Sequence, residues 1–295
     1  MKKSLIALAV AGALTAPMVA QADATLYGSM RIKLVDNDAT NLDVQDNSSR
    51  IGIRGSSDLF SGAKAIFQFE QAISTEDGKF SGGRLANLGM TGDFGTALFG
   101  RIWTPYYNWT GAQTDVSDSA VSAASAYELS LHRVPNIIAY VTPDMNGFQA
   151  AVAVAADAAT DTDDDNVDIA HVAANYNANG LNVGISYVDL EGNAGVGEEQ
   201  VFSAAAGYTM GDLYVAGRYE DRDEANQDAW ELAATYSIGN TKLVANYIDD
   251  EAESDDQWVL EVQQKLGAQA RVFASIVEYG GAEDNGFEVG YRVDF

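Results

Sequence analysis

The chain has 295 residues, of which 47% are apolar and 20% charged, and its 17 Lys and Arg stand against 43 Asp and Glu, for a net charge of −26. This excess of acidic residues argues against nucleic acid as a partner, because phosphate backbones are bound by basic surfaces. The complete lack of cysteine excludes a disulfide scaffold, a thiolate metal centre and thiol catalysis. Outside the N-terminus, no apolar run approaches the roughly 20 residues that a membrane-spanning helix needs.

The N-terminus has the three-part pattern of a secretory signal. Lys2 and Lys3 precede an apolar run at residues 5–16, which is too short to span a membrane, and Ala20-Gln21-Ala22 follows as a small-x-small cleavage motif. The pattern predicts a signal peptide at 1–22 and a single domain at 23–295. Without its two lysines the exported chain carries a charge of −28.

Two-residue alternation dominates the rest of the chain. At 229–238, Trp230, Leu232 and Tyr236 fall on one face, whereas Glu231 and Thr235 fall on the other, which is the pattern of a half-buried strand. We count sixteen such segments, which begin near Ala24, Ser49, Gly62, Arg84, Gly95, Asn136, Phe148, Val167, Leu181, Gln200, Asp212, Gln227, Thr241, Gln257, Gln269 and Gly286. Short turns alternate with longer polar segments between them, as expected if all tight turns lie at one end of a barrel.

Two all-β architectures fit this pattern. A soluble β-sandwich would bury the apolar face, whereas a transmembrane antiparallel β-barrel would turn it toward lipid and enclose the polar face. Sixteen strands without a linker favour the barrel. Aromatic residues near the strand ends suit the interfacial girdles of a membrane barrel: Tyr27, Trp103, Trp230, Tyr236, Tyr247, Trp258 and Tyr291.

Several segments resemble the Gram-negative general porins. They are ATLYGSMR at 24–31, SRIGIRGSSDL at 49–59, GAKAIFQFE at 62–70, GDFGTALFGR at 92–101, RVPN at 133–136, YVTP at 140–143 and YRVDF at 291–295. From 158 to 284 only the alternation and the rhythm of turns agree. The resemblance implies a 16-stranded barrel, usually a homotrimer, in the outer membrane, with a long third loop folded into the pore. It also implies that Phe295 is a signal for the outer-membrane assembly machinery.

The function that this resemblance implies is passive diffusion of ions and small hydrophilic solutes through a water-filled channel. The alternative is a substrate-specific channel for a sugar or a small anion. An outer-membrane enzyme or adhesin is disfavoured, because the chain has only two histidines, His132 and His171, and no catalytic constellation. No metal or cofactor is expected, and the expected partners besides further copies of the chain are outer-membrane lipid and lipopolysaccharide.

Basic residues concentrate in the first third of the chain, and the two-residue alternation predicts which of them face the lumen. A basic wall facing the lumen is predicted from Arg31, Lys33, Arg50, Arg54 and Arg84. Tyr27 shares this inward face. Arg101 shares a face with Phe99 and is predicted to lie outside the pore.

The long connection at 102–133 is polar and acidic, and loops of this length are usually functional. If it folds inward, Asp115 and Asp118 face the basic wall, and Glu70 is a further acid on the lumen face. Glu128 belongs to the same connection. Because the other long loops are also acidic, we expect cation preference at low salt, when the charges at the mouth are least screened.

Overall fold

The computed structural model describes residues 23–38, 41–119, 131–156, 167–190, 199–223, 227–251, 256–279 and 285–295. The expected signal peptide lies outside these residues. No helix among them is long and apolar enough to cross a membrane.

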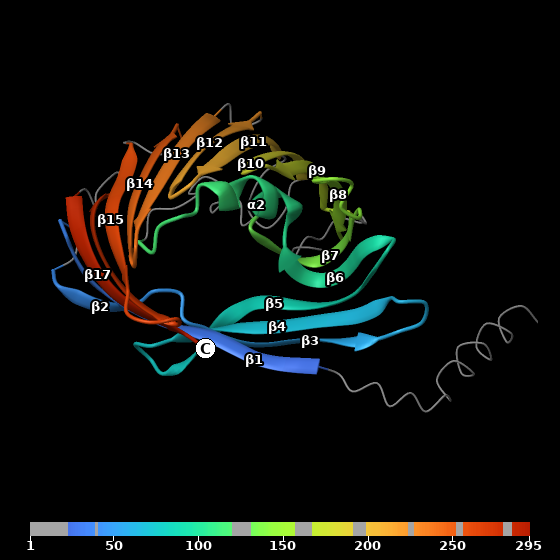
Figure 1. Ribbon diagram of the computed structural model, residues 1–295, viewed down its shortest axis with the longest axis horizontal. Coiled ribbons are helices and arrows are strands. Elements are labelled where there is room, and N and C mark those ends of the chain that lie inside the picture. Colours follow the sequence, from blue (N-terminus) through green and yellow to red (C-terminus); the bar gives the residue numbers. More distant parts are fainter. Residues whose placement is uncertain are drawn as a thin grey trace, which may run out of the picture.

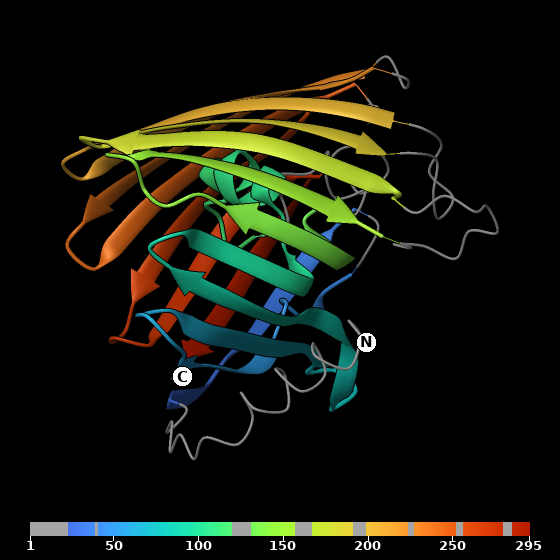
Figure 2. The ribbon, with the colours of Figure 1, turned by 90° about the vertical axis from the view of Figure 1, so that its right-hand side faces the viewer.

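One antiparallel sheet closes on itself to form a barrel around a central lumen (Figures 1 and 2). Its strands are β1 (Asp23–Asn37), β2 (Asp43–Asp46), β3 (Arg50–Asp58), β4 (Lys64–Ser74), β5 (Lys79–Gly92), β6 (Gly95–Trp103), β7 (Arg133–Val141), β8 (Phe148–Ala155), β9 (Ile169–Ala178), β10 (Leu181–Leu190), β11 (Glu199–Met210), β12 (Leu213–Arg222), β13 (Gln227–Ile238), β14 (Thr241–Asp250), β15 (Gln257–Lys265), β16 (Ala270–Glu278) and β17 (Asn285–Asp294). β2 pairs with the second half of β1, and β3 pairs with its first half. The two strands therefore fill one position together, and the barrel has sixteen strand positions. The predicted fold class is confirmed.

The two ends of the chain close the barrel. β1 pairs with β17 from Ser29 opposite Asp294 to Asn37 opposite Gly286. Phe295 extends this ladder, because its N–H donates to the Gly28 carbonyl at 3.0 Å and its carbonyl accepts from the Gly28 N–H at 2.8 Å. The Phe295 ring covers Gly28, where an added Cβ would lie 2.4 Å from Cζ of the ring. The role of Phe295 as an assembly signal stays a prediction.

Most strands begin within three residues of the predicted positions, and two features differ. β5 begins at Lys79 instead of near Arg84, because a glycine-rich stretch without alternation continues the ladder with β4 through two register shifts. The short β2 was not predicted. It carries little alternation, and Asp46 at its end is held by the backbone N–H groups of Ser49 and Thr75.

The two faces of the barrel differ as the alternation predicts. On β13, Trp230 and Leu232 point outward and are 54% and 57% exposed, whereas Glu231 is buried in the interior. Large apolar side chains are exposed in this way around the barrel, which is the surface that a lipid bilayer would cover. Two residues predicted for the aromatic girdles are exceptions. Tyr27 contacts Glu70 inside the lumen, as its alternation predicts, and Trp103 lines an internal cavity.

We predict that Leu232→Arg, in the middle of β13, lowers the free energy of unfolding in lipid by about 2–4 kcal/mol, because it places a charge in hydrocarbon. Thr235→Arg is the matched control on the opposite face of the same strand, since Thr235 lines the internal cavity. We expect it to change the stability by no more than about 0.5 kcal/mol. Urea unfolding in vesicles measures both, and equal losses would contradict the assignment of the faces.

Candidate functional site

The connection between β6 and β7 is here called loop 3, and its described residues, 104–119 and 131–132, enter the lumen (Figure 1). Its first part forms the helix α2 (Pro105–Trp109), which lies against β9 and β10, and the 3₁₀ helix η1 (Gly111–Gln113), which lies against β11 and β12. Thr104 caps α2, because its hydroxyl accepts from the Tyr107 N–H at 3.2 Å, and Pro105 occupies the first turn. The prediction that a long third loop folds into the pore is therefore confirmed.

Part of the barrel wall beneath α2 is apolar. Tyr106 and Leu131 from loop 3 are fully buried in a cluster with inward-facing side chains such as Ile137, Val188 and Val201. The described part of loop 3 therefore packs directly against the wall here.

The backbone of loop 3 also comes very close to the wall. A Cβ at position 184 would lie only 1.9 Å from the Trp109 carbonyl oxygen, so Gly184 on β10 is required for this contact. Loop 3 therefore packs as an inner layer of the wall and not as a free plug.

Arg218 on β12 fixes loop 3 electrostatically. It is 2% exposed and forms ion pairs with Glu220 and Glu231, which are as deeply buried. The Tyr106 hydroxyl donates to Glu220 and accepts from Arg218, and the Thr114 hydroxyl donates to Glu231. A buried charge is costly unless it is paired and hydrogen-bonded. Here each carboxylate forms an ion pair with the Arg218 guanidinium and also accepts a hydrogen bond from a hydroxyl of loop 3.

The next part of loop 3 follows the wall strand by strand. The Tyr214 hydroxyl on β12 donates to the Gln113 carbonyl at 2.8 Å, and the Asn246 amide on β14 donates to the Thr114 carbonyl at 2.6 Å. On β15, Glu261 accepts from the backbone N–H groups of Asp118 and Ser119, both at 2.9 Å. Polar backbone that loop 3 buries is thus satisfied by wall side chains.

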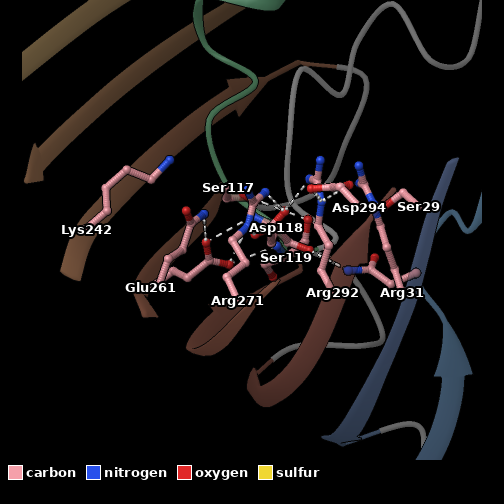
Figure 3. A network of polar contacts seen from close by, with 12 residues as sticks. Ser29, Arg31, Ser117, Asp118, Ser119, Lys242, Glu261, Arg271, Arg292 and Asp294 are labelled. Atoms are coloured by element: carbon pink, nitrogen blue, oxygen red, sulfur yellow. Dashed lines mark hydrogen bonds and ion pairs between the residues drawn. The ribbon is translucent and has the colours of Figure 1, made fainter. Parts of the chain in front are cut away.

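Asp118 lies between two arginines of the last strands (Figure 3). Nη2 of Arg271 on β16 lies 2.6 Å from Oδ1 of Asp118, and Nη1 of Arg292 on β17 lies 3.2 Å from the same oxygen. Burial raises the pKa of Asp118, but the hydrogen bond and charge of Arg271 and the charge of Arg292 outweigh it, so that the pKa lies below its usual range. Asp118 is therefore ionised at neutral pH and neutralises part of the basic surface around it.

Two other side chains of loop 3, Tyr107 and His132, also line the cavity beside it. The Tyr107 hydroxyl donates to Asp115 at 2.5 Å. Burial, with the charges of Arg218 and Arg133, lowers the pKa of His132 to about 4, so His132 is neutral at pH 7. Glu128 lies outside the described residues.

The open part of the lumen beside loop 3 is a cavity of about 950 Å³. Among the described residues, eight basic side chains line it: Arg31, Lys33, Arg50, Arg84, Arg133, Lys242, Arg271 and Arg292. The acidic side chains that line it in this part of the chain are Asp46, Asp115 and Asp118. We call these eight residues the basic arc and the space they surround the constriction.

The structure brings four residues of the predicted basic wall to the constriction: Arg31, Lys33, Arg50 and Arg84. Arg54 lies elsewhere, in a second cavity of about 600 Å³, with its guanidinium 5.1 Å from the Tyr27 ring centroid. Glu70 is buried behind the arc, 2.6 Å from Nε of Arg84 and 3.9 Å from Nε of Arg50.

Alternation is not the reason for the position of Arg84. Leu85 is buried and not lipid-facing, and Arg84 falls where the β4–β5 register shifts between Glu70 and Gln71. Arg101 is not among the lining residues of the constriction, and its Nε donates to the Arg84 carbonyl at 3.1 Å.

Four members of the basic arc were missed in the sequence. Alternation could have found Arg271, Arg292 and Lys242, because each is next to a lipid-facing residue: Val272, Tyr291 and Leu243. Arg133 was missed because β7 begins three residues earlier than predicted.

A closed barrel with an apolar belt, a signal-like N-terminus and a loop pinned inside the lumen defines an outer-membrane β-barrel of the porin class. The family model for Gram-negative porins matches residues 7–286, and the chain belongs to this family. The chain is therefore an outer-membrane protein. Because the members of this family are channel proteins, the prediction that the chain is not an enzyme is confirmed.

Individual relatives agree with this assignment. The major outer membrane protein P.IB of Neisseria gonorrhoeae is 30% identical over 233 residues, which are 73% of this chain and 64% of that protein, so the chain spans less than two thirds of that relative. A monosaccharide porin of a Halomonas species is 28% identical over 270 residues, 78% of this chain and 73% of that protein. Among solved structures, the anion-selective porin from Comamonas acidovorans has the same fold, with a TM-score of 0.72 and 20% identity over 93% of this chain and 100% of that one.

We predict that Tyr106→Phe loosens loop 3, because Glu220 and Arg218 each lose a buried hydroxyl partner, at a cost of about 1–3 kcal/mol. The expected result is a lower thermal stability and greater noise in the open-channel current. Tyr107→Phe is the matched control, since its hydroxyl contacts Asp115 within loop 3 and not the wall. Equal noise in the two variants would show that the Arg218 contacts do not hold the loop.

Proposed function

We propose that the chain forms a water-filled channel for passive diffusion of ions and small hydrophilic solutes, and that its constriction favours anions. The observation that carries this proposal is the composition of the constriction, where eight basic and three acidic side chains lie among the residues that the structure describes. An ion that passes here lies within a few ångströms of fixed charges, and rings of such charges set ion selectivity. The solved anion-selective porin of the same fold is in keeping with this proposal.

The acidic residues near the constriction lower its positive charge without reversing it. Asp118 is shared between Arg271 and Arg292, and Glu70 is shared between Arg84 and Arg50. We infer that the basic arc lines the pore, that Asp115, Asp118 and Glu70 moderate its charge, and that Arg54 lines the lumen away from the constriction.

The negative net charge of the chain favours cations and so opposes the effect of the basic arc. Acidic loops at the mouth would concentrate cations there, and the expected cation preference at low salt stays a prediction. The Debye length falls from about 8 Å at 0.15 M to about 3 Å at 1 M salt. Charges at the mouth act across open water and are screened first, so we expect the basic arc to dominate in concentrated salt.

The substrate-specific alternative has one observation in its favour. Trp103 and Tyr107 stack with ring centroids 4.4 Å apart beside the constriction, and aromatic faces bind sugars as well as cations. One relative is named a monosaccharide porin. A specific channel would show an ion current that glucose blocks in a saturable way, whereas a diffusion channel would not.

We predict that replacing Arg50 and Arg84 with Gln raises the permeability of K⁺ relative to Cl⁻ by about twofold or more and increases conductance, because two fixed positive charges leave the narrow passage. Asp115→Asn with Asp118→Asn should shift the ratio toward Cl⁻. Reversal potentials in planar bilayers under a KCl gradient measure both changes.

Lys64→Gln is the control for these variants, since Lys64 is exposed and lies beside Asp58 outside the constriction. It should leave the ratio unchanged. If the two double variants and the control all keep the wild-type reversal potential, neither set of charges lies at the narrow point.

We further propose that the channel is a homotrimer in contact with outer-membrane lipid and lipopolysaccharide, and that the outer-membrane assembly machinery inserts it. We predict that the unheated protein migrates on gels near three times the mass of the processed chain and that boiling converts it to the monomer. A detergent-solubilised protein that is monomeric before heating would contradict the trimer.

A further inference from the structure

Trp103 lies where strict alternation does not put it. By alternation it shares the outward face of β6 with Phe99 and Arg101. The β5–β6 ladder ends at Ala86 opposite Arg101, and the β6–β7 register shifts between Gly100 and Ile102. Such irregularities redirect side chains near functional sites. Trp103 consequently lines both the constriction and the second cavity that contains Arg54.

The indole of Trp103 joins two members of the basic arc. Cζ of Arg133, the residue directly opposite on β7, lies 4.6 Å from the ring centroid, and Cζ of Arg84 on β5 lies at 5.9 Å. Tyr107 stacks on the indole with an interplanar angle of 20°. The Tyr107 ring contacts His132 in turn, at 4.6 Å between centroids. The indole is thus fixed by loop 3 on one side and is in contact with guanidinium groups on the other.

We propose that Trp103 is a positioning residue for anion selectivity, which holds Arg133 toward the constriction by cation–π contact. This inference rests on the proposed anion preference of the constriction. An aromatic face restrains a guanidinium without itself adding a negative charge, and tryptophan is the strongest such partner.

Reversal potentials in planar bilayers at about 1 M KCl, where the basic arc should dominate, test the inference. We expect Trp103→Leu to lower the Cl⁻-to-K⁺ permeability ratio about twofold although no charge is removed. Trp103→Phe should recover part of the loss. Trp230→Leu, a lipid-facing tryptophan, is the matched control and should leave the ratio unchanged.

A double-mutant comparison separates positioning from a general disturbance of the pore. Arg133→Gln should lower the ratio at least as much as Trp103→Leu, and the double variant should lower it no further than Arg133→Gln alone, because both changes act through one guanidinium. Arg133→Lys keeps the charge but lacks the planar group, so it should also lower the ratio. Heat stability of the unboiled oligomer on gels checks that each variant is assembled.

The inference is overturned if Trp103→Leu keeps the wild-type ratio while Arg133→Gln lowers it, or if the two effects add fully. If Trp103→Leu does not assemble, Trp103→Phe and Arg133→Lys carry the test, and wild-type ratios in both overturn it. A wild-type channel without anion preference at about 1 M KCl contradicts the proposed function instead. The positioning role is then judged by the shift of each variant from that wild-type value.

Discussion

Loop 3 can lie inside the lumen because side chains of the barrel wall bind backbone and side-chain groups along its described part. Arg218 is central, since it is enclosed between Glu220 and Glu231 and donates to the Tyr106 hydroxyl of α2. Removing one member of such a buried cluster leaves an uncompensated charge, which is far more costly than the loss of a surface ion pair. The cluster therefore sets the position of α2 and, through Thr114, the path of the loop toward β15.

The position of loop 3 determines which wall side chains line the open part of the lumen. On the side of β8 to β12 the described part of the loop packs against the barrel wall, partly through an apolar cluster. The constriction lies beside β1, β3, β5, β16 and β17, and the described side chains that these strands contribute to it are basic. We propose that the narrow passage of a chain with a net charge of −26 is thus lined mainly by charges of the opposite sign. Selectivity depends on charges within a few ångströms of the ion, so the local composition is the relevant quantity.

The barrel itself could be predicted from the sequence because its signal is local. Each strand repeats an inside–outside alternation, and residues such as Leu232 and Glu231 need only their own strand to be assigned to a face. The same rule places Arg31, Lys33 and Arg50 in the lumen. Alternation also places Arg271 and Arg292 on the inward faces of β16 and β17, next to the outward-facing Val272 and Tyr291.

The rest depends on irregularities and long-range contacts that alternation does not contain. Arg84 and Trp103 reach the constriction where a register shifts or a ladder ends. The partners that hold Tyr106 and Asp118 lie more than 100 residues away in the chain. A pattern within one strand carries no information about such pairs. Asp118 could therefore be identified as an acid of loop 3, but its ion pairs with Arg271 and Arg292 could not be predicted.

The dependence of selectivity on salt tests most directly whether local charge outweighs net charge. Reversal potentials of the wild-type channel should be measured at a constant KCl ratio while the mean concentration rises from about 0.01 M to about 1 M, across which the Debye length falls from about 30 Å to about 3 Å. We expect any cation preference to fade as the acidic mouth is screened and Cl⁻ to be preferred at the highest concentration. A cation preference that persists at about 1 M would show that the basic arc does not line the narrow passage.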